Sequence, residues 1–309
     1  MATLEFKVTD DLNGERLDRV AAKLATGLSR ARLKKAIEER AVRVNGRVKK
    51  KGDIVSAGDT ISIVEEKVSN PDAPAVPTPD APLDVRFEGE GVVVVDKPAG
   101  QPTAPLRPNE SGTLANALVA RYPEMAGVGY GAREPGLVHR LDTDTSGLVV
   151  CARNAEAFEV LRDALRDGRL EKRYLLVCDE ADLADSGTID IPIANHPKDQ
   201  RRVYPCIHPR DVMRYAPRPA STRYEVLKRA HGLALVEVEV SRALRHQIRA
   251  HFSAIGHPLV GDALYGGKLA EGLGRHALHA SRVTFAGAAN VAKLDVRSHL
   301  PPALQALID

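Results

Sequence analysis

The first sixty residues show two helical patterns of apolar positions, followed by short alternating runs. One amphipathic helix is predicted by four apolar residues at the spacing of a single helix face, namely Leu17, Val20, Ala21 and Leu24. A second is predicted after the N-cap residue Ser29, with a buried stripe of Leu33, Ala36 and Ile37. Strands are then expected on both sides of an Asn45-Gly46 hairpin turn and over residues 60–64. The order is therefore helix, helix, short strands.

From residue 84 onward, apolar strands and amphipathic helices follow one another without strict alternation. Strands are predicted over residues 92–95, 148–150, 174–177, 222–227 and 233–240. Helices are predicted over residues 114–122, 155–165 and around 244–252, and residues 195–220 are expected to form an irregular surface excursion. This order of elements favours the α+β class, with a mixed, largely antiparallel sheet.

A proline-rich stretch separates the two patterns. Residues 67–83 contain five prolines among Ala, Asp, Ser and Thr, a composition typical of an extended tether. We therefore predict a small domain over residues 14–66, a linker over 67–83 and a larger domain over 84–309.

The charge of the chain is unevenly distributed between these parts. The whole chain has 44 Lys and Arg against 41 Asp and Glu, a formal charge of +3. Residues 14–64 alone hold 13 Lys and Arg against 6 Asp and Glu. Such a surplus is either an ordinary solvated surface or a site for phosphate groups. The second interpretation is favoured, because the excess gathers on one predicted helix and the adjoining turn.

Several classes of protein are not supported by the composition. No apolar run approaches the length of a membrane span, and the N-terminal residues are acidic and lack the apolar core of a secretory signal. The three cysteines are far apart, which argues against a zinc ribbon or a disulfide framework and favours a reducing cytoplasm. No coiled coil is predicted, so a monomer is the expectation.

The most unusual stretch is the polar loop of residues 136–147, with the sequence GLVHRLDTDTSG. A metal site using His139, Asp142 and Asp144 lacks a further His or Cys at ligand spacing. Ser146 as a nucleophile lacks the flanking glycines of a nucleophile elbow. Two interpretations remain open: an Asx-type turn that is only structural, and an aspartate kept ionised by an arginine and used as nucleophile or base.

A second polar cluster supplies possible partners for such an aspartate. It directly follows the strand predicted over 233–240 and contains Arg242, Arg245, His246, Gln247, Arg249 and His251. Arg245 and Arg249 are four residues apart on a predicted helix, so both could point at one phosphate or carboxylate.

The small domain resembles an S4-like RNA-binding domain. The resemblance covers the RLD run at residues 16–18, the SRARL run at 29–33 and the VRVNG turn at 42–46. It implies binding of structured RNA through the second helix and the hairpin that follows. The residues expected to contact RNA are Arg30, Arg32, Lys34, Lys35, Arg43, Asn45, Arg47 and Lys49.

The large domain is similar to the RluA-like pseudouridine synthases. The similarity lies in the HRLDxxTSG run at residues 139–147, the KRY run at 172–174 and the HQIRxH run at 246–251. The motifs DKPAG at 96–100 and GDxxYG at 261–266 also match. Together with the S4-like domain, the resemblance indicates the branch that acts on large-subunit (23S) ribosomal RNA.

The resemblance implies a role for individual residues. Asp142 would be the catalytic aspartate, Tyr174 the ring that stacks on uracil and Arg249 the partner of Asp142. Substrate binding is expected from other residues of the same motifs, namely His139, Arg140, Thr145, Arg245, His246 and Gln247. The reaction detaches uracil from ribose, turns it and rejoins it through C5. It involves no redox step, so neither a cofactor nor a metal is expected.

One departure from the family pattern bears on substrate choice. The positions that usually hold Thr-Gly-Arg before the HQIR run are Arg242-Ala243-Leu244 here. We therefore keep two alternatives to a ribosomal RNA enzyme: a transfer-RNA pseudouridine synthase, and a non-catalytic RNA-binding or ribosome-assembly factor.

Overall fold

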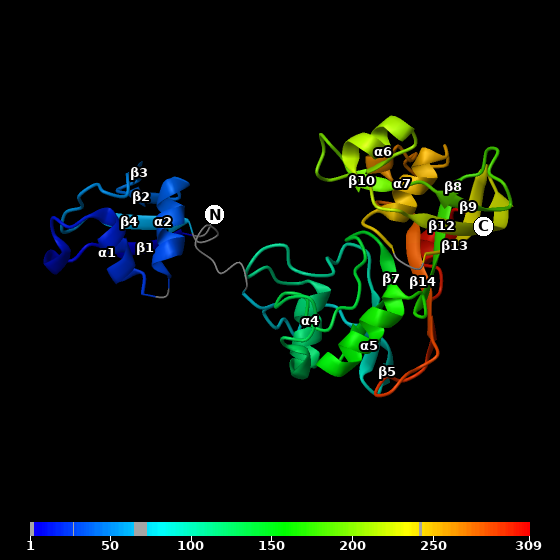
Figure 1. Cartoon of the computed structure of the whole chain (residues 1–309), viewed down its shortest axis with the longest axis horizontal. Coiled ribbons are helices and arrows are strands. Elements are labelled where there is room, and N and C mark those ends of the chain that lie inside the picture. The colour runs from blue at the N-terminus through cyan, green and yellow to red at the C-terminus, as the bar shows by residue number, and fades with distance from the viewer. Residues whose placement is uncertain (1–2, 27, 65–72, 241–242) are drawn as a thin grey trace. The chain divides into compact units, whose positions relative to one another are not determined.

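The computed structural model describes residues 3–26, 28–64, 73–240 and 243–309, and the chain divides into two compact units (Figure 1). The first unit runs to Ala73, and the second contains most of the chain from Pro74 to Asp309. No helix in these described ranges is long and apolar enough to cross a membrane.

The first unit packs two helices on a small antiparallel sheet. The sheet has the order β1-β4-β2-β3, formed by β1 (Thr3–Lys7), β4 (Thr60–Val64), β2 (Val42–Val44) and β3 (Arg47–Val48). The two predicted helices are present as α1 (Leu17–Leu24) and α2 (Arg30–Glu38), and a 3-10 turn spans Asp10–Leu12. Asn45 and Gly46 both have positive φ angles, 49° and 76°, as the predicted hairpin turn requires.

The start of this unit lies earlier than the sequence indicated. The predicted domain begins at residue 14, but β1 pairs along its whole length with β4. Leu4 and Phe6 of this strand pack against the core, while the alternate residues Thr3, Glu5 and Lys7 are exposed. A single five-residue alternation is too short to be recognised without its partner strand.

A twisted sheet of nine strands forms the centre of the second unit. Its order is β5-β6-β7-β14-β8-β13-β12-β9, with β15 paired to β14. The strands span Asp84–Gly89, Val92–Lys97, Ser146–Ala152, Leu278–Phe285, Glu171–Asp179, Leu233–Glu239, Ser221–Ala230, Ser186–Asp190 and, for β15, Leu294–Arg297. Only β7 and β14 pair in parallel among these neighbours. The predicted α+β class with a largely antiparallel sheet is confirmed.

The sheet is buried on both faces where β6 and β7 cross the unit. Val93 and Val95 face the helix α4 (Leu114–Arg121), and Val92 and Val94 face the helix α5 (Ala155–Arg166). This explains why the strand reads as an unbroken apolar run rather than an alternation. The unit also contains 3-10 turns at Pro123–Met125 and Ala263–Tyr265, and a short helix α8 (Pro302–Gln305).

Residues 74–83, which the sequence assigned to the linker, lie against the second unit. Thr78 N–H donates to the Asn116 carbonyl at 3.1 Å, and the Asn116 side chain donates to the Val76 carbonyl at 2.7 Å. The Gln101 side chain likewise donates to the Pro82 carbonyl at 2.9 Å. Partners far along the chain thus order a segment whose composition alone favours a tether. Residues 65–72 lie outside the described part.

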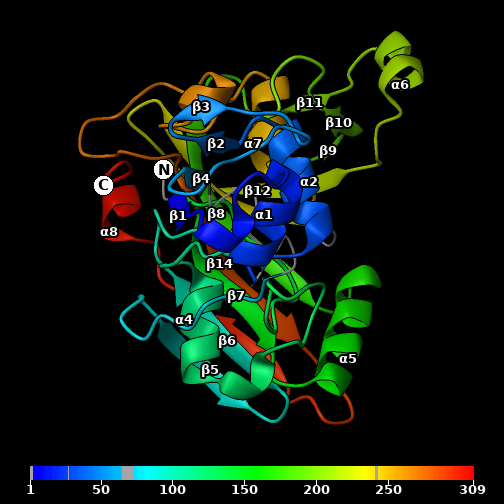
Figure 2. The same ribbon diagram turned by 90° about the vertical axis from the view of Figure 1, so that its left-hand side faces the viewer.

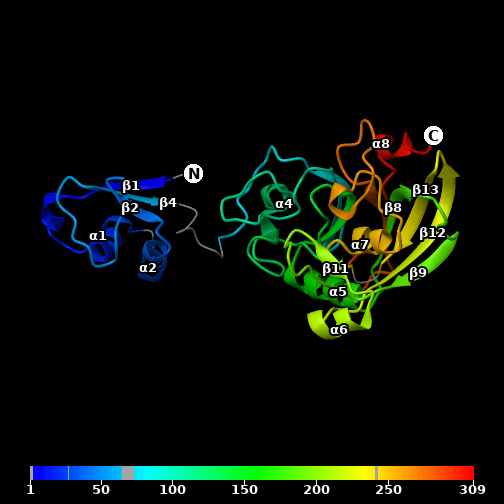
Figure 3. The same ribbon diagram turned by 90° about the horizontal axis from the view of Figure 1, so that it is seen from above.

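The excursion over residues 195–220 is more regular than predicted. It begins with a two-stranded hairpin, β10 (Ile193–Asn195) and β11 (Val203–Pro205), and continues into the helix α6 (Pro209–Tyr215). Figure 2 shows α6 standing away from the main sheet. The chain then returns through β12 and β13 to the helix α7 (Gln247–Ala254), which packs on the inner side of the curved strands β8, β13 and β12 (Figure 3).

Candidate active site

The loop that carries Asp142 is anchored to the sheet by two buried side chains. Lys97, at the end of β6, donates from Nζ to the carbonyls of Pro98, Gln101 and Thr143 at 2.8 to 3.0 Å. The Thr103 hydroxyl donates to the Leu141 carbonyl at 2.7 Å. Because residues on both sides of Asp142 are held in this way, the position of its carboxylate is fixed before any substrate arrives.

Asp142 forms an ion pair with Arg249 of α7. Arg249 Nη1 donates to Asp142 Oδ2 at 2.8 Å, while its Nε and Nη2 donate to the two oxygens of Asp262 at 2.6 and 2.8 Å. Burial disfavours the charge of Arg249, but its bonds to Asp262 and its attraction to Asp142 outweigh this and raise its pKa. The guanidinium therefore stays charged beside Asp142.

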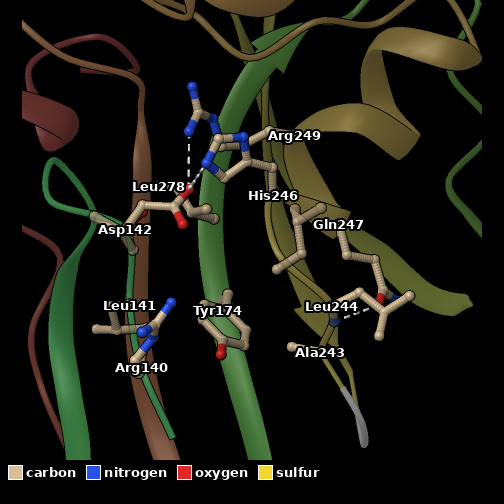
Figure 4. A pocket seen from close by; sticks show the side chains of 12 residues that line it. Arg140, Leu141, Asp142, Tyr174, Ala243, Leu244, His246, Gln247, Arg249 and Leu278 are labelled. Carbon is tan, nitrogen blue, oxygen red and sulfur yellow. Dashed lines mark hydrogen bonds and ion pairs between the residues drawn. The ribbon is translucent and has the colours of Figure 1, made fainter. Parts of the chain in front are cut away.

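An open pocket lies beside this ion pair and includes Tyr174 of β8 (Figure 4). Its other lining residues come from the Asp142 loop, from α7 and the segment before it, and from β14: Arg140, Leu141, Thr145, Ala243, Leu244, His246, Gln247, Ile248 and Leu278. Tyr174 is only 4% exposed, and burial raises the pKa of its hydroxyl, an effect that the charge of Asp142 increases. The tyrosine is therefore neutral at pH 7.

Residues just before α7 and at its start contribute in different ways. The Gln247 side chain accepts from Leu244 N–H at 2.9 Å and donates to the Ser221 carbonyl at 2.8 Å. Arg245 donates to the carbonyls of Gln200 and Arg202. Gln247 thus fixes the backbone beside the pocket, and Arg245 ties the segment before α7 to residues 200–202. Arg242, the first residue of the atypical Arg242-Ala243-Leu244 run, lies outside the described residues.

The three remaining candidates in the polar loop also differ from one another. Arg140 lines the pocket, is more than half exposed and pairs with Glu134 at 2.8 Å. The Thr145 hydroxyl bonds to His276 Nε2 at 2.7 Å. His139 is buried and does not line the pocket: its Nε2 accepts from Val150 N–H at 3.1 Å, and burial lowers its pKa well below the usual value.

The alternative readings of the loop fit less well. An Asx-type turn would require backbone amides to donate to these side chains, and among the described residues none donates to the side chain of Asp142, Asp144 or Ser146. Asp142 instead pairs with Arg249, and Ser146 bonds to His279 and Arg275. Within the described residues, no cluster of three His, Cys, Asp or Glu could hold a metal ion. The arrangement fits an aspartate held by an arginine.

The residues proposed for RNA contact in the first unit lie on α2, on β2 and around the β2–β3 turn. Most are exposed, although Lys34 and Lys35 each lie 3.9 Å from a glutamate one turn further along α2. Asn45 has a structural role, since it bonds to Asp59 and to Thr60 N–H. Arg43 donates to the Gly46 carbonyl.

Sequence reasoning assigned no role to three residues that shape the site: Lys97, Asp262 and Tyr265. Asp262 and Tyr265 belong to the GDxxYG run at residues 261–266, and Lys97 to the DKPAG run. The sequence offered one indication of such roles: each of the three is a charged or polar residue in a short motif that also contains glycine. The contacts that give these residues their place in the site join distant parts of the chain: Lys97 to Thr143, Asp262 to Arg249 and Tyr265 to His246. No local pattern shows them.

Comparison with known proteins identifies the families that the two parts of the chain match. The family described as RNA pseudouridylate synthase matches residues 91–254, and the S4 domain family matches residues 15–61. An uncharacterized RNA pseudouridine synthase of Aquifex aeolicus is 36% identical, over 86% of this chain and 80% of that protein. Ribosomal large subunit pseudouridine synthase D of Xanthomonas campestris is 33% identical, over 97% of this chain and 90% of that protein.

The fold also matches a solved structure, that of human RNA Pseudouridylate Synthase Domain Containing 1. The TM-score is 0.57 at 23% identity, over 74% of this chain and 89% of that one. These findings define an RNA-modifying enzyme with an S4 domain. The chain belongs to the RNA pseudouridylate synthase family, whose members isomerise uridine to pseudouridine.

Proposed function

We propose that this enzyme isomerises uridines of large-subunit ribosomal RNA, with Asp142 as its catalytic aspartate. The substrate is supported by relatives named ribosomal large subunit pseudouridine synthase D, which match 90% or more of this chain in Xanthomonas campestris and Yersinia pestis. The S4 domain adds a basic surface for structured RNA. A ribosomal substrate implies action in the cytoplasm, and we propose that the enzyme acts as a monomer.

The observation that carries the catalytic assignment is the environment of the Asp142 carboxylate. Its Oδ2 is held by Arg249, and among the described residues no donor lies within hydrogen-bond distance of Oδ1. Figure 4 shows that second oxygen on the side of the pocket where Tyr174 lies. One oxygen is thus fixed while the other is free to attack the nucleotide.

The isomerisation places three demands on the site, and these residues meet them. The bond between ribose C1′ and uracil N1 must break while the fragments stay together, and a covalent bond to Asp142 Oδ1 retains one of them. The uracil ring must be held after it leaves the RNA stack, and Tyr174 offers an aromatic face. The carboxylate must be regenerated when C1′ bonds to C5, and the charge of Arg249 stabilises it at that point. The proton of C5 is then lost to solvent and N1 takes up a proton, which balances the isomerisation and releases the C5 hydrogen.

The other candidate residues support RNA on either side of this pocket. We propose that Arg140, which lines the pocket, attracts a phosphate there, and that Arg245, one residue before the pocket-lining His246, attracts a phosphate nearby. His246, Gln247 and Thr145 line the pocket and are proposed to shape it. His139 acts from behind the loop, since its contact is with β7.

The test compares Asp142→Asn with Asp144→Asn, an exposed aspartate of the same loop. Release of tritium from RNA labelled at uridine C5 is measured on large-subunit ribosomal RNA and on transfer RNA. We expect Asp142→Asn to abolish release and Asp144→Asn to retain it, with ribosomal RNA as the better substrate. Full activity of Asp142→Asn would refute the catalytic assignment, and activity on transfer RNA alone would refute the substrate.

A further inference from the structure

His246, the N-cap residue of α7, has a left-handed backbone conformation, with φ 53° and ψ 16°. This conformation is uncommon for residues other than glycine and concentrates at functional sites. It turns the imidazole toward the catalytic loop, where Nε2 lies 3.7 Å from Asp142 Oδ2 (Figure 4). The other ring nitrogen, Nδ1, lies 3.1 Å from the hydroxyl of Tyr265.

The hydrogen bonds of Tyr265 determine which nitrogen of His246 carries the proton. Tyr265 is 4% exposed, and its hydroxyl oxygen accepts from Val203 N–H at 2.8 Å. The hydroxyl proton still needs an acceptor, because a buried donor without one is costly. Among the described residues, His246 Nδ1 is the acceptor within reach. Nδ1 therefore presents its lone pair, and the proton of the neutral ring lies on Nε2.

The ring of Tyr265 is itself held firmly. The guanidinium carbons of Arg249 and Arg202 each lie 5.2 Å from its centroid. Burial also lowers the pKa of His246, so the ring is neutral at pH 7. The charged and titratable groups around His246 are Asp142, Arg245, Arg249, Asp262 and Tyr265.

We propose that Tyr265 is a positioning residue for isomerisation: it fixes His246 in the tautomer protonated at Nε2, which presents a second N–H donor to Asp142 Oδ2. Arg249 and His246 then hold the same carboxylate oxygen and leave Oδ1 directed into the pocket. A small closure of the 3.7 Å separation completes the hydrogen bond. The proposal rests on the proposed function only in assuming that Asp142 is the reacting carboxylate.

This donor matters most when the bond between Asp142 Oδ1 and the nucleotide breaks. At that step the bonding electron pair returns to the carboxylate, and the negative charge spreads over both oxygens. The neutral N–H of His246 stabilises this charge without transferring its proton. A variant in which the N–H of His246 no longer points at Asp142 should therefore lose more in kcat than it loses through a raised KM.

The tautomer is tested directly by nitrogen NMR of protein labelled with ¹⁵N in its histidine rings. The His246 signals are assigned by their loss in His246→Gln. We expect a protonated Nε2 and an unprotonated Nδ1 in the unmodified protein, and a mixture of tautomers in Tyr265→Phe. Protonation at Nδ1 in the unmodified protein would overturn the proposal. These signals do not depend on turnover, so the result stands whether or not Asp142→Asn is inactive.

Steady-state kinetics test whether the Nε2-protonated tautomer of His246 contributes to the reaction. Because one neutral hydrogen bond is involved, Tyr265→Phe should lower kcat about tenfold, with KM within about twofold. Gln at position 246 offers an amide donor near the place of Nε2 and needs no tautomer. We therefore expect Tyr265→Phe to have less than about a twofold effect in the His246→Gln background.

The matched control is Tyr224→Phe, since Tyr224 is also buried and lines no part of the Asp142 pocket. It should retain the kcat of the unmodified protein, and thermal unfolding checks that each variant folds. An equal loss from Tyr265→Phe in both backgrounds would show that Tyr265 acts through Val203 alone. That outcome, or an unchanged kcat in Tyr265→Phe, would overturn the proposal.

Discussion

Asp142 and Arg249 lie 107 positions apart in the sequence and are joined by a 2.8 Å hydrogen bond between Oδ2 and Nη1. The geometry of this bond depends on a third residue, because Asp262 accepts from the other two nitrogens of the same guanidinium. Asp262 is 1% exposed, and Arg249 is its ion-pair partner in this buried position. The position of the candidate catalytic carboxylate thus depends on a buried ion pair next to it.

Asp262→Asn should therefore destabilise the fold and misalign Arg249. The substitution leaves the buried guanidinium of Arg249 with only the partly exposed Asp142 as a counter-charge. We therefore expect the free energy of unfolding to fall by about 3 kcal/mol, the lower end of the range for a broken buried ion pair. A matched control is Asp295→Asn, because Asp295 also binds an arginine through two bonds, at 2.8 and 2.9 Å, but at the surface. Its loss should be below about 1 kcal/mol. Equal losses in denaturant titrations would contradict this reasoning.

Replacing either of two buried lysines by methionine should change the free energy of unfolding, but in opposite directions. Lys97 donates to three carbonyls, whereas Lys172 is 3% exposed and, among the described residues, makes no hydrogen bond or ion pair. Lys97→Met should lower the free energy of unfolding by about 2–3 kcal/mol, because it leaves buried carbonyls unpaired. Lys172→Met should raise it by about 1–3 kcal/mol, since it removes a charged group from a side chain that is almost fully buried and has no ion-pair partner among the described residues. Urea unfolding at pH 7 checks both.

The gain from Lys172→Met should depend on pH. Burial lowers the pKa of Lys172 from 10.5 to about 8, so between these values the unfolded chain binds more protons than the folded protein. The free energy of unfolding of the unmodified protein therefore rises with pH between about 8 and 10.5. The gain from Lys172→Met should be complete below pH 8 and shrink as pH approaches 10.5. Urea unfolding of both proteins at pH 7, 9 and 10 measures it, and a gain that grew with pH would exclude this cause.

Sequence patterns predicted those helices and strands in which the apolar positions are also the buried ones. α1 and α5 each have one apolar face, and the β6 run is apolar because both of its faces are buried. β14 was missed because polar residues such as His279 and Ser281 are buried in it through bonds to distant partners. Long-range partners likewise order residues 74–83, which no local pattern could indicate.

The candidate site was predictable as motifs but not as contacts. The Asp142 loop and the HQIR run are recognisable in the sequence, and the structure brings Asp142, Tyr174 and Arg249 to one pocket. Their assigned roles stay predictions until tested. The sequence could not tell that Gln247 bonds the chain beside it, because an amide can serve a substrate or the backbone equally well.

Tyr174 should be needed for its aromatic face more than for its volume. Tyr174→Leu keeps the pocket wall apolar but removes the surface on which a base stacks. Stacking on an aromatic side chain contributes about 1–3 kcal/mol per base, so kcat/KM on ribosomal RNA should fall about 10- to 100-fold. Tyr174→Phe retains the ring and should bind RNA as the unmodified protein does. Steady-state kinetics measure kcat/KM, and binding titrations measure RNA affinity, for both variants. An equal loss of RNA affinity in Tyr174→Leu and Tyr174→Phe would contradict a stacking role.

The first unit should govern how RNA affinity depends on salt. Replacing three cationic residues by glutamine would remove phosphate contacts from α2 and the β2–β3 turn: Arg30, Arg47 and Lys49. Each lost contact lowers the steepness of log K against log salt by about 0.7–0.9, so we expect a decrease of about 2. The control removes the same charge from the second unit, at Lys228, Lys293 and Arg297, and should leave the slope unchanged. Equal slopes for both triple variants in filter-binding titrations would place the phosphate contacts elsewhere.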